Sequence, residues 1–386
     1  MDRTTLPDRS MHPWSDNMPD EFDPTLELGL PPDRYVVCTC RGFISKNNDL
    51  RDLCGKFIDC GENFFDVLER YDKLTSYVLN REDATSGSYA KWCVPFLKAF
   101  GATDHLIHKY SCENLAMMDN AKRTMNYISG LLPTYITTST YEHAMMEIMD
   151  RIDCPLIQMS CTSLCIDQCM MGRAESRKLR DIAKEISQLK VPKGFYELNV
   201  PTELLDEDIE IIKKIDDVIS NRIPDAGAMS LMESTDAQTS HKKAYRMLDI
   251  RRLTAIDLDC TMYIGSASTD FQPMDLIHEA GGLSIAYNGE DFAVRGATVA
   301  ILSEDTTVGA LFASVFADKG PQAAVELAEN WSREYLRNGN LPDNNLAETL
   351  LEEHPGQLPE VYALKNSNVD KIAKRSEAYR RSLLGI

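Results

Sequence analysis

The chain has 386 residues, of which 43% are apolar, so it can bury a substantial core, and its length favours two or three compact units over one. Its 41 basic and 60 acidic residues give a formal net charge of −19, which argues against nucleic acid or an anionic membrane as the main partner. No run approaches 18 consecutive apolar residues, and the start of the chain is polar and rich in proline, so we expect neither a signal peptide nor a membrane span.

The first part of the chain combines an arm, a strand and a helical unit. Residues 1–32 contain many acids and prolines and few aliphatic side chains, which is typical of a loosely attached arm. The apolar run 35–39 predicts a β-strand, and Gly42 predicts a turn directly after it. From 47 to 132 apolar residues recur at three- and four-residue spacing, which predicts a helical unit.

A second strand is expected at 134–138, followed by a helix. This strand ends in hydroxyl side chains, among them Thr138 and Ser139. They could donate hydrogen bonds to a ligand oxygen. Strands favour threonine and helices favour a hydroxyl residue at the N-cap, so a purely structural role is also open.

The segment 153–225 predicts a smaller unit with two amphipathic helices and a short strand at 194–201. It contains Cys161, Cys165 and Cys169, which would form a stripe on a helix and, with Cys154, could bind a metal or an iron–sulfur cluster. The stretch is poor in helix formers and lacks the usual Cys-x₂-Cys pair, so burial in the core is favoured. Eleven cysteines in such a chain indicate reduced thiols in a cytoplasm.

Two polar motifs precede the next strand. A helix beginning near 239 carries Lys242 and Lys243 side by side at its start, where surface lysines are common. The run Asp257-Leu-Asp-Cys-Thr261 carries two acids, and it leads directly into a strand instead of leaving one. Its acids are therefore expected at the edge of the sheet where that strand begins, far from Asp270.

The stretch 262–289 predicts a strand–helix–strand unit, with strands at 262–264 and 283–287. Between them lie a loop of small residues and then Asp270, at the edge of the sheet where ligands bind in open parallel folds. One more strand is expected at 298–302. Residues 321–386 predict a helical, acidic extension that packs on the domain or mediates self-association into a homodimer.

The stretch 262–289 resembles the last motif of haloacid-dehalogenase-type phosphotransferases, most closely those like phosphoserine phosphatase. Gly265, Asp270, Ala280-Gly281 and Asn288-Gly289 stand at motif positions, whereas Ser266 replaces the first acid.

The segment Thr39-Cys-Arg-Gly-Phe-Ile-Ser45 is similar to the first motif of the same proteins. The similarity is closest to the Asp-Cys-Glu-Gly-Pro-Ile-Ser form of an archaeal group related to the energy-converting hydrogenase A subunit R family. Thr39 and Arg41 replace the two acids of that motif.

The resemblance implies a fold class and a division of the chain. The fold is α/β, with a haloacid-dehalogenase-like Rossmannoid parallel sheet core, a helical cap, a second smaller insertion and a helical tail. The expected units are a flexible arm at 1–32, a core at 33–46 plus 133–152 plus 226–320, a cap at 47–132, a second insertion at 153–225 and an extension at 321–386.

The resemblance also implies the site. The nucleophile and acid–base positions fall on Thr39 and Arg41, the phosphoryl-binding hydroxyl on Thr138 or Ser139, and the charge-neutralising lysine on Lys243. The residues expected to bind a ligand are Arg41, Gly42, Thr138, Ser139, Lys243, Ser266 and Asp270. Of the four positions that hold Mg²⁺ in the family only Asp270 keeps an acid, so we expect no cofactor, and Mg²⁺ only if the protein is active.

The replaced acids favour a protein that no longer hydrolyses phosphate esters and serves as a binding or regulatory module for a phosphorylated ligand or a protein partner. We expect Arg41 and Lys243 to make the pocket positive; alternatively, Arg41 pairs with an acid such as Asp270 and closes the site. An active phosphotransferase that recruits Asp33, Asp49 or Asp270 is the second hypothesis. A metal or redox protein built on Cys38, Cys40 and the group Cys161, Cys165 and Cys169 is the third.

Overall fold

The computed structural model describes residues 33–154, 157–190, 206–223, 229–365 and 367–385. The expected arm at 1–32 and the expected strand at 194–201 lie outside these residues.

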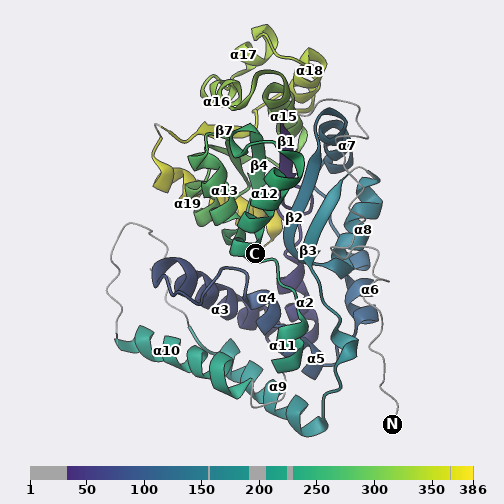
Figure 1. The fold of residues 1–386 in the computed structure, drawn as a ribbon, viewed down its shortest axis with the longest axis vertical. Coiled ribbons are helices and arrows are strands. Elements are labelled where there is room, and N and C mark those ends of the chain that lie inside the picture. Colours follow the sequence, from purple (N-terminus) through teal and green to yellow (C-terminus); the bar gives the residue numbers. More distant parts are fainter. Residues whose placement is uncertain (1–32, 155–156, 191–205, 224–228, 366, 386) are drawn as a thin grey trace.

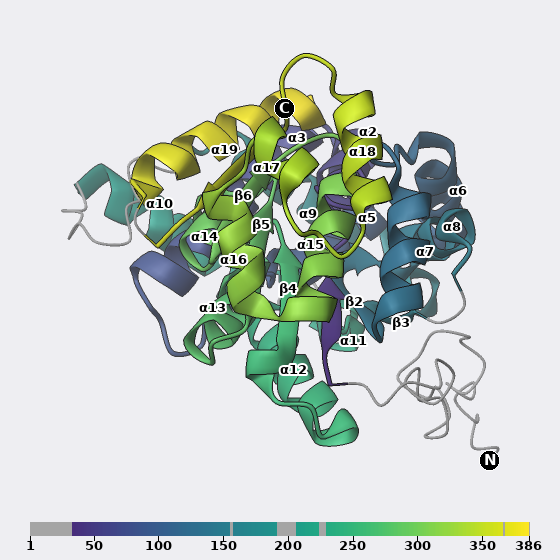
Figure 2. The same cartoon turned by 90° about the horizontal axis from the view of Figure 1, so that it is seen from above.

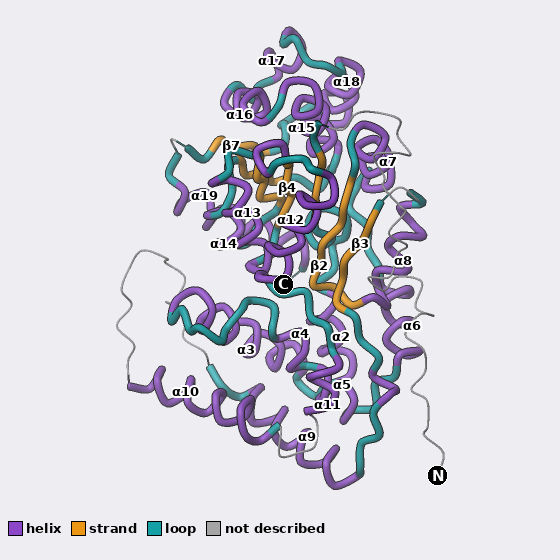
Figure 3. The backbone as a smooth tube through the Cα atoms, viewed as in Figure 1, coloured by secondary structure: helices purple, strands orange, loops and turns teal. Residues whose placement is uncertain are grey.

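A seven-stranded sheet in the order β3-β2-β1-β4-β5-β6-β7 forms the centre of the molecule (Figures 1 and 3). All neighbouring strands are parallel except β6 and β7, which are antiparallel. The strands are β1 (Tyr35–Cys38), β2 (Thr134–Tyr141), β3 (Gln158–Thr162), β4 (Thr261–Gly265), β5 (Leu283–Tyr287), β6 (Val299–Leu302) and β7 (Glu360–Ala363). The α/β class with a mainly parallel sheet is confirmed.

Helices cover both faces of the sheet, which explains why β1 reads as an uninterrupted buried run. One face packs against α7 (Ala121–Leu131), α8 (Glu142–Ile152) and α15 (Thr307–Lys319) in a single apolar cluster. The helices on the other face are α12 (Ser240–Thr254), α13 (Phe271–Glu279), α14 (Asp291–Arg295) and α19 (Val369–Leu384). Figure 2 shows α19 alongside α14 and β6.

A helical body lies at one end of the sheet (Figure 1). Helices from the two expected insertions share one apolar cluster, so they form one body instead of two separate units. The first group is α2 (Asp49–Phe57), α3 (Gly61–Lys73), α4 (Tyr89–Trp92), α5 (Val94–Ala99) and α6 (Asp104–Asn114). The second group is α9 (Arg173–Ser187) and α10 (Asp206–Asp217). The helix α11 (Met229–Ser234) comes from the segment 226–320 that was expected in the core, but it packs against α4 and α5 of this body.

Two strands were not expected from the sequence. β3 lies within the segment 153–225, and it is the edge strand beside β2. β7 lies within the expected helical extension 321–386, after α16 (Pro321–Glu329), α17 (Arg333–Asn338) and α18 (Asn344–Glu353). All four residues of β7 are only partly buried, as is usual for a strand at the edge of a sheet.

The three cysteines do not form a stripe on a helix, because Cys161 lies on β3 while Cys165 and Cys169 flank a short 3₁₀ turn. Burial in the core, which the sequence favoured, holds only in part: all three are partly exposed, although Cys161 and Cys169 pack against the apolar clusters. Cys165 approaches Asp104, with 3.5 Å between Sγ and Oδ2. Among the described residues no group of three histidine, cysteine or acidic side chains is placed to hold a metal ion. None of the helices in the described ranges has the length and apolar character that crossing a membrane requires.

Candidate functional site

The first and last motifs meet at the carboxyl edge of the sheet. The amide of Thr39 donates to the carbonyl of Ile264 at 2.9 Å, which extends the pairing of β1 and β4. Gly42 has φ +82°, and a Cβ on it would lie 3.2 Å from the Cβ of Ser266, so the turn requires glycine. The hydroxyl of Ser266 donates to the carbonyl of Arg41. The side chain of Asn288 donates to the carbonyl of Gly42 at 2.8 Å and fixes the same turn.

Lys243 and Asp270 form a fully buried ion pair, with 2.7 Å between Nζ and Oδ1. Tyr263 donates to the same oxygen at 2.9 Å. The other oxygen, Oδ2, accepts the amides of Ser266 and Ala267, each at 2.9 Å. Every strong contact of this carboxylate is therefore made inside the protein, and the lysine and the one remaining motif acid neutralise each other.

Arg41 is also paired within the chain. Its guanidinium lies 2.5 Å from Oε1 of Glu290 and 3.7 Å from the carboxylate of Glu69 on α3. Burial alone would lower the pKa of Arg41, but the two carboxylates raise it above its ordinary value. Arg41 therefore pairs with acids of the chain, but these are Glu290 and Glu69 instead of Asp270.

Glu290, which follows the Asn288-Gly289 turn, is the centre of this arrangement. Besides Arg41 it contacts Lys73 at 2.9 Å and Arg380 at 3.2 Å, and its Oε2 accepts the amide of Ser268 at 3.0 Å. Burial alone would raise the pKa of Glu290, but Lys73, Arg41 and Arg380 hold it well below its ordinary value.

Arg380 reaches the site from α19 and is 2% exposed. It donates to the carbonyl of Asn288 at 2.9 Å and to that of Ser266 at 3.3 Å. The sequence contains no signal for this contact, because α19 carries several other basic residues and nothing distinguishes this one. Glu290 directly follows the Asn288-Gly289 turn of the motif, so its position in the sequence did offer a signal for a site residue.

Thr138 and Ser139, expected to bind a phosphoryl group, lie near the same edge and each makes a contact within the chain. Thr138 is 2% exposed, and its hydroxyl donates to that of Thr140 at 3.0 Å. Thr140 in turn donates to Asp49 at 3.3 Å. Burial, with Asp52 adding a smaller effect, raises the pKa of Asp49 to about 6. The carbonyl of Ser139 accepts the hydroxyl of Thr162 on β3 at 2.9 Å.

The residues at this edge do not fit Mg²⁺. Thr39, Arg41 and Ser266 offer no carboxylate, and both oxygens of Asp270 accept hydrogen bonds from the protein. Burial raises the pKa of both Cys38 and Cys40, which favours the protonated thiol over the thiolate.

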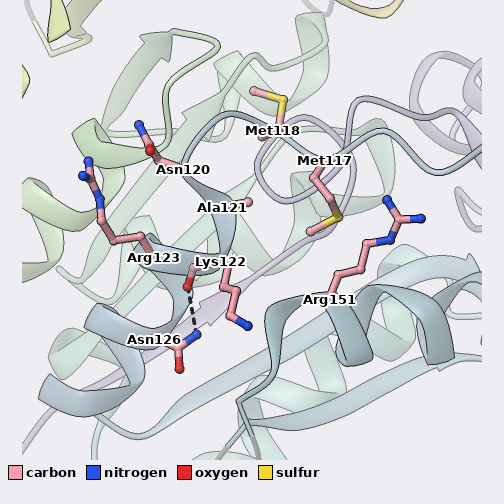
Figure 4. A pocket seen from close by; sticks show the side chains of 8 residues that line it. All are labelled: Met117, Met118, Asn120, Ala121, Lys122, Arg123, Asn126 and Arg151. Atoms are coloured by element: carbon pink, nitrogen blue, oxygen red, sulfur yellow. Dashed lines mark hydrogen bonds between the residues drawn. The ribbon is translucent and has the colours of Figure 1, made fainter.

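Two surface hollows lie away from these residues. One, of about 580 Å³, lies beside α7 and is lined by Met117, Met118, Asn120, Ala121, Lys122, Arg123, Asn126 and Arg151 (Figure 4). Its basic side chains all pair with acids: Lys122 with Asp153, Arg123 with Glu353 and Arg151 with Glu147. The other, of about 340 Å³, lies beside β7 and is lined in part by Trp331, Arg333 and Tyr362. Neither hollow contains a motif residue.

The run from Asp257 to Thr261 lies at the start of a strand, as the sequence predicts. A 3₁₀ turn, Leu258–Cys260, leads directly into β4, so Asp257 and Asp259 lie at the amino end of that strand. Asp257 pairs with Arg251 on the surface. It does not belong to the candidate site.

No protein-family model and no curated protein matches the chain. Among solved structures, the gene product AF1437 from Archaeoglobus fulgidus is similar over 92% of this chain and 97% of its own, with 19% identity and a TM-score of 0.73. A phospho-aspartyl intermediate analogue of phosphoserine phosphatase covers 71% of this chain and 95% of its own, with 9% identity and a TM-score of 0.42. An apo form of phosphoserine phosphatase has the same coverage, with 11% identity and a TM-score of 0.41.

The similarity to the Archaeoglobus protein extends over nearly the whole of both chains and concerns the fold alone. Within that fold, the first and last motifs meet at one sheet edge, as the resemblance in the sequence requires, and Lys243 joins them there. The chain therefore shares its α/β fold, a mainly parallel sheet covered by helices on both faces, with the Archaeoglobus protein.

Proposed function

We propose that this protein does not hydrolyse phosphate esters and acts as a binding or regulatory module for a protein partner in the cytoplasm. The observation that carries the proposal is the closed set of ion pairs at the carboxyl edge of the sheet. Arg41 is held by Glu290 and Glu69, and Lys243 is held by Asp270, all with little or no exposure.

The absent nucleophile supports this proposal. In the family that the sequence resembles, phosphoryl transfer uses an aspartate at the end of the first strand as the nucleophile. The side chains there in this chain are a buried hydroxyl, Thr39, and a guanidinium, Arg41. A threonine without an adjacent base is a poor nucleophile, and no contact of Thr39 supplies one among the described residues. The fold would then be kept for its surface and not for chemistry.

The direct test is an assay of aryl phosphate hydrolysis under three conditions: with Mg²⁺, with Mn²⁺ and with excess chelator. We expect no turnover above a buffer blank in any of the three. Chelator-sensitive turnover that co-purifies with the protein and disappears in an Asp270→Asn variant would contradict the proposal. A phosphatase of known activity serves as the positive control.

The alternative, an active phosphotransferase, is favoured by one observation at Asp49. Its carboxylate accepts the hydroxyl of Thr140 near the end of β2, and its pKa of about 6 would suit an acid–base group. Under this alternative, Asp49→Asn abolishes a turnover that the unmodified protein possesses. Under our proposal there is no turnover for the substitution to remove.

The short segment from Thr39 to Ser45 supports a narrower assignment of the protein within the family that it resembles. Its similarity to the motif of the archaeal group related to the energy-converting hydrogenase A subunit R family leads us to infer that the protein belongs near that group. A phosphorylated ligand is less favoured than a protein partner, because Arg41 and Lys243 are both paired within the chain. Calorimetry against phosphate is expected to give no heat at millimolar concentration.

A further inference from the structure

Five charged side chains from four parts of the chain meet at one buried point. Arg41 follows β1, Glu69 and Lys73 lie on α3, Glu290 precedes α14, and Arg380 lies on α19. None of these side chains is more than 14% exposed. Glu290 is the anion that contacts all three cations of this cluster.

The donors around Glu290 form a complete anion-binding set. Its Oε1 accepts Arg41 at 2.5 Å and Arg380 at 3.2 Å, while its Oε2 accepts Lys73 at 2.9 Å and the Ser268 amide at 3.0 Å. Two guanidinium groups, an ammonium group and a backbone amide are the groups that proteins use to bind carboxylates and phosphoryl groups. Each oxygen has two donors, so the occupant of the site is fully coordinated.

We propose that Glu290 is a built-in ligand, whose carboxylate fills an anion-binding site formed by Arg41, Lys73, Arg380 and the Ser268 amide and so holds the helical body closed against the sheet. The inference rests on the proposed function, in which this edge performs no chemistry. It adds the class of ligand that the site accepts, a small carboxylate or a phosphoryl group.

The charge balance of the cluster explains why the occupant matters. With Glu290 present, three cations face two carboxylates. Without it, three cations face Glu69 alone. Buried cations that lose their partner repel one another and lack the water that would otherwise screen them, so the site should open or take up an anion from solution.

The position of Lys73 explains why closure depends on the same carboxylate. Lys73 and Glu69 belong to α3 of the helical body, whereas Glu290 and Arg380 belong to the sheet and its covering helices. Glu290 is thus the shared partner that joins a cation of the helical body to cations of the sheet side. Loss of its charge removes the attraction across this contact.

The test is chemical rescue of a Glu290→Ala variant. The substitution removes one methylene and the carboxylate, which together have the size of acetate. We expect the melting temperature to fall by roughly 5–15 °C in chloride, since breaking buried pairs is costly. Sodium acetate should restore several degrees in a saturable manner, whereas sodium chloride at equal ionic strength should not. Inorganic phosphate is the second probe.

Three controls separate a specific site from general effects. Glu326→Ala removes an exposed acid on α16 and should melt like the unmodified protein in both salts. Glu290→Gln fills the space and removes the charge, so it should be destabilised without responding to acetate. Hydrogen exchange of α3 should be faster in Glu290→Ala and slow down again in acetate.

A variant that folds poorly still gives an answer through its refolding yield from urea, which should be higher in acetate than in chloride. Equal melting temperatures and equal refolding yields in the two salts would overturn the inference. So would a Glu290→Ala variant as stable as the unmodified protein. No phosphate ester is used, so failure here is distinct from the discovery of phosphatase activity, which would instead remove the proposed function.

Discussion

Arg41 stands where the resemblance places an acid, and its surroundings show why that acid could not simply be restored. Glu290 and Glu69 both lie within ion-pair distance of the guanidinium. An aspartate at position 41 would face two carboxylates of like charge. The surroundings of position 41 therefore suit a cation and not an acid.

This leads to a prediction for Arg41→Asp against the nearly isosteric Arg41→Asn. Both lose the ion pairs, but only the aspartate adds like-charge repulsion, so we expect it to be less stable by about 1–3 kcal/mol near neutral pH. Urea unfolding at several pH values measures the difference. The gap should shrink at acidic pH, as the new carboxyl takes up a proton. Equal stability at neutral pH would mean that Glu290 and Glu69 do not act on this position.

Asp72 is a buried acid whose charge costs stability. It is 1% exposed and accepts the amides of Gly87 at 2.8 Å and Ser88 at 3.0 Å. Burial raises its pKa to about 7, although these amides oppose the shift. The folded state therefore holds this proton more tightly than the unfolded state, whose carboxyl has a pKa near 3.8.

It follows that the stabilisation from the bound proton is complete below pH 4 and is lost as pH rises towards 7. The slope is about 1.4 kcal/mol per pH unit. In Asp72→Asn, whose amide cannot ionise, this slope should be absent. Between pH 4.5 and 7 the unfolding free energy of the unmodified protein should therefore fall relative to that of Asp72→Asn. Parallel curves for the two proteins would show that Asp72 does not titrate in this range.

At the scale of elements, the contact between the helical body and the sheet is tight around Tyr77. This residue lies on a π-helical turn, Leu74–Val78, that continues α3. Its hydroxyl donates to the carbonyl of Ser268 at 2.6 Å, and its ring lies 4.7 Å from that of Phe292 and 5.3 Å from that of Phe271. The contact fixes α3 beside the loop that supplies the Ser268 amide to Glu290.

Tyr77→Ala should therefore destabilise the protein by about 2–4 kcal/mol through the lost aromatic packing. Amides of α3 should exchange faster, whereas those of α15, on the other face of the sheet, should be unchanged. Tyr77→Phe keeps the rings in contact and should show a smaller effect. Faster amide exchange throughout the molecule would indicate global destabilisation and not a local effect on α3.

The elements that the sequence predicted are those with buried, regularly patterned residues. The strands at 35–39, 134–138, 262–264, 283–287 and 298–302 correspond to β1, β2, β4, β5 and β6 within a few residues, because strands covered on both faces are rich in apolar and β-branched residues. β3 and β7 lie at the two edges of the sheet, where one side is open and the pattern is weak. Their pairing depends on neighbours that a local pattern does not contain.

The site was predictable only in part, for a similar reason. The strand ends place Thr39, Arg41, Ser266 and Asp270 together, because parallel strands present their carboxyl ends at one edge. The partners of these residues come from helices at a distance in sequence. Arg41 and Glu290 are 249 residues apart, and no spacing rule relates them.

At the scale of the whole molecule, the eleven cysteines differ widely in access to solvent. Cys38, Cys40, Cys54, Cys93 and Cys154 are buried, and Cys60 is exposed. We expect iodoacetamide to modify Cys60 first in the folded protein, and the buried group only after unfolding in urea, as read by mass spectrometry. A Cys60→Ser variant is the control. Rapid native modification of Cys40 would mean that the edge of the sheet opens to solvent.

The central position of β1 has a consequence for how the chain is made. β1 pairs with β2 on one side and with β4 on the other, and β4 begins only at Thr261, 226 residues after its partner Tyr35. During synthesis the edge of β1 that will pair with β4 therefore stays unpaired while the helical body is synthesised. Closing so large a loop is slow, and an open strand edge invites pairing with other chains. Nascent chains stalled before β4 should bind chaperones or aggregate, whereas those stalled beyond β6 should be protected from protease.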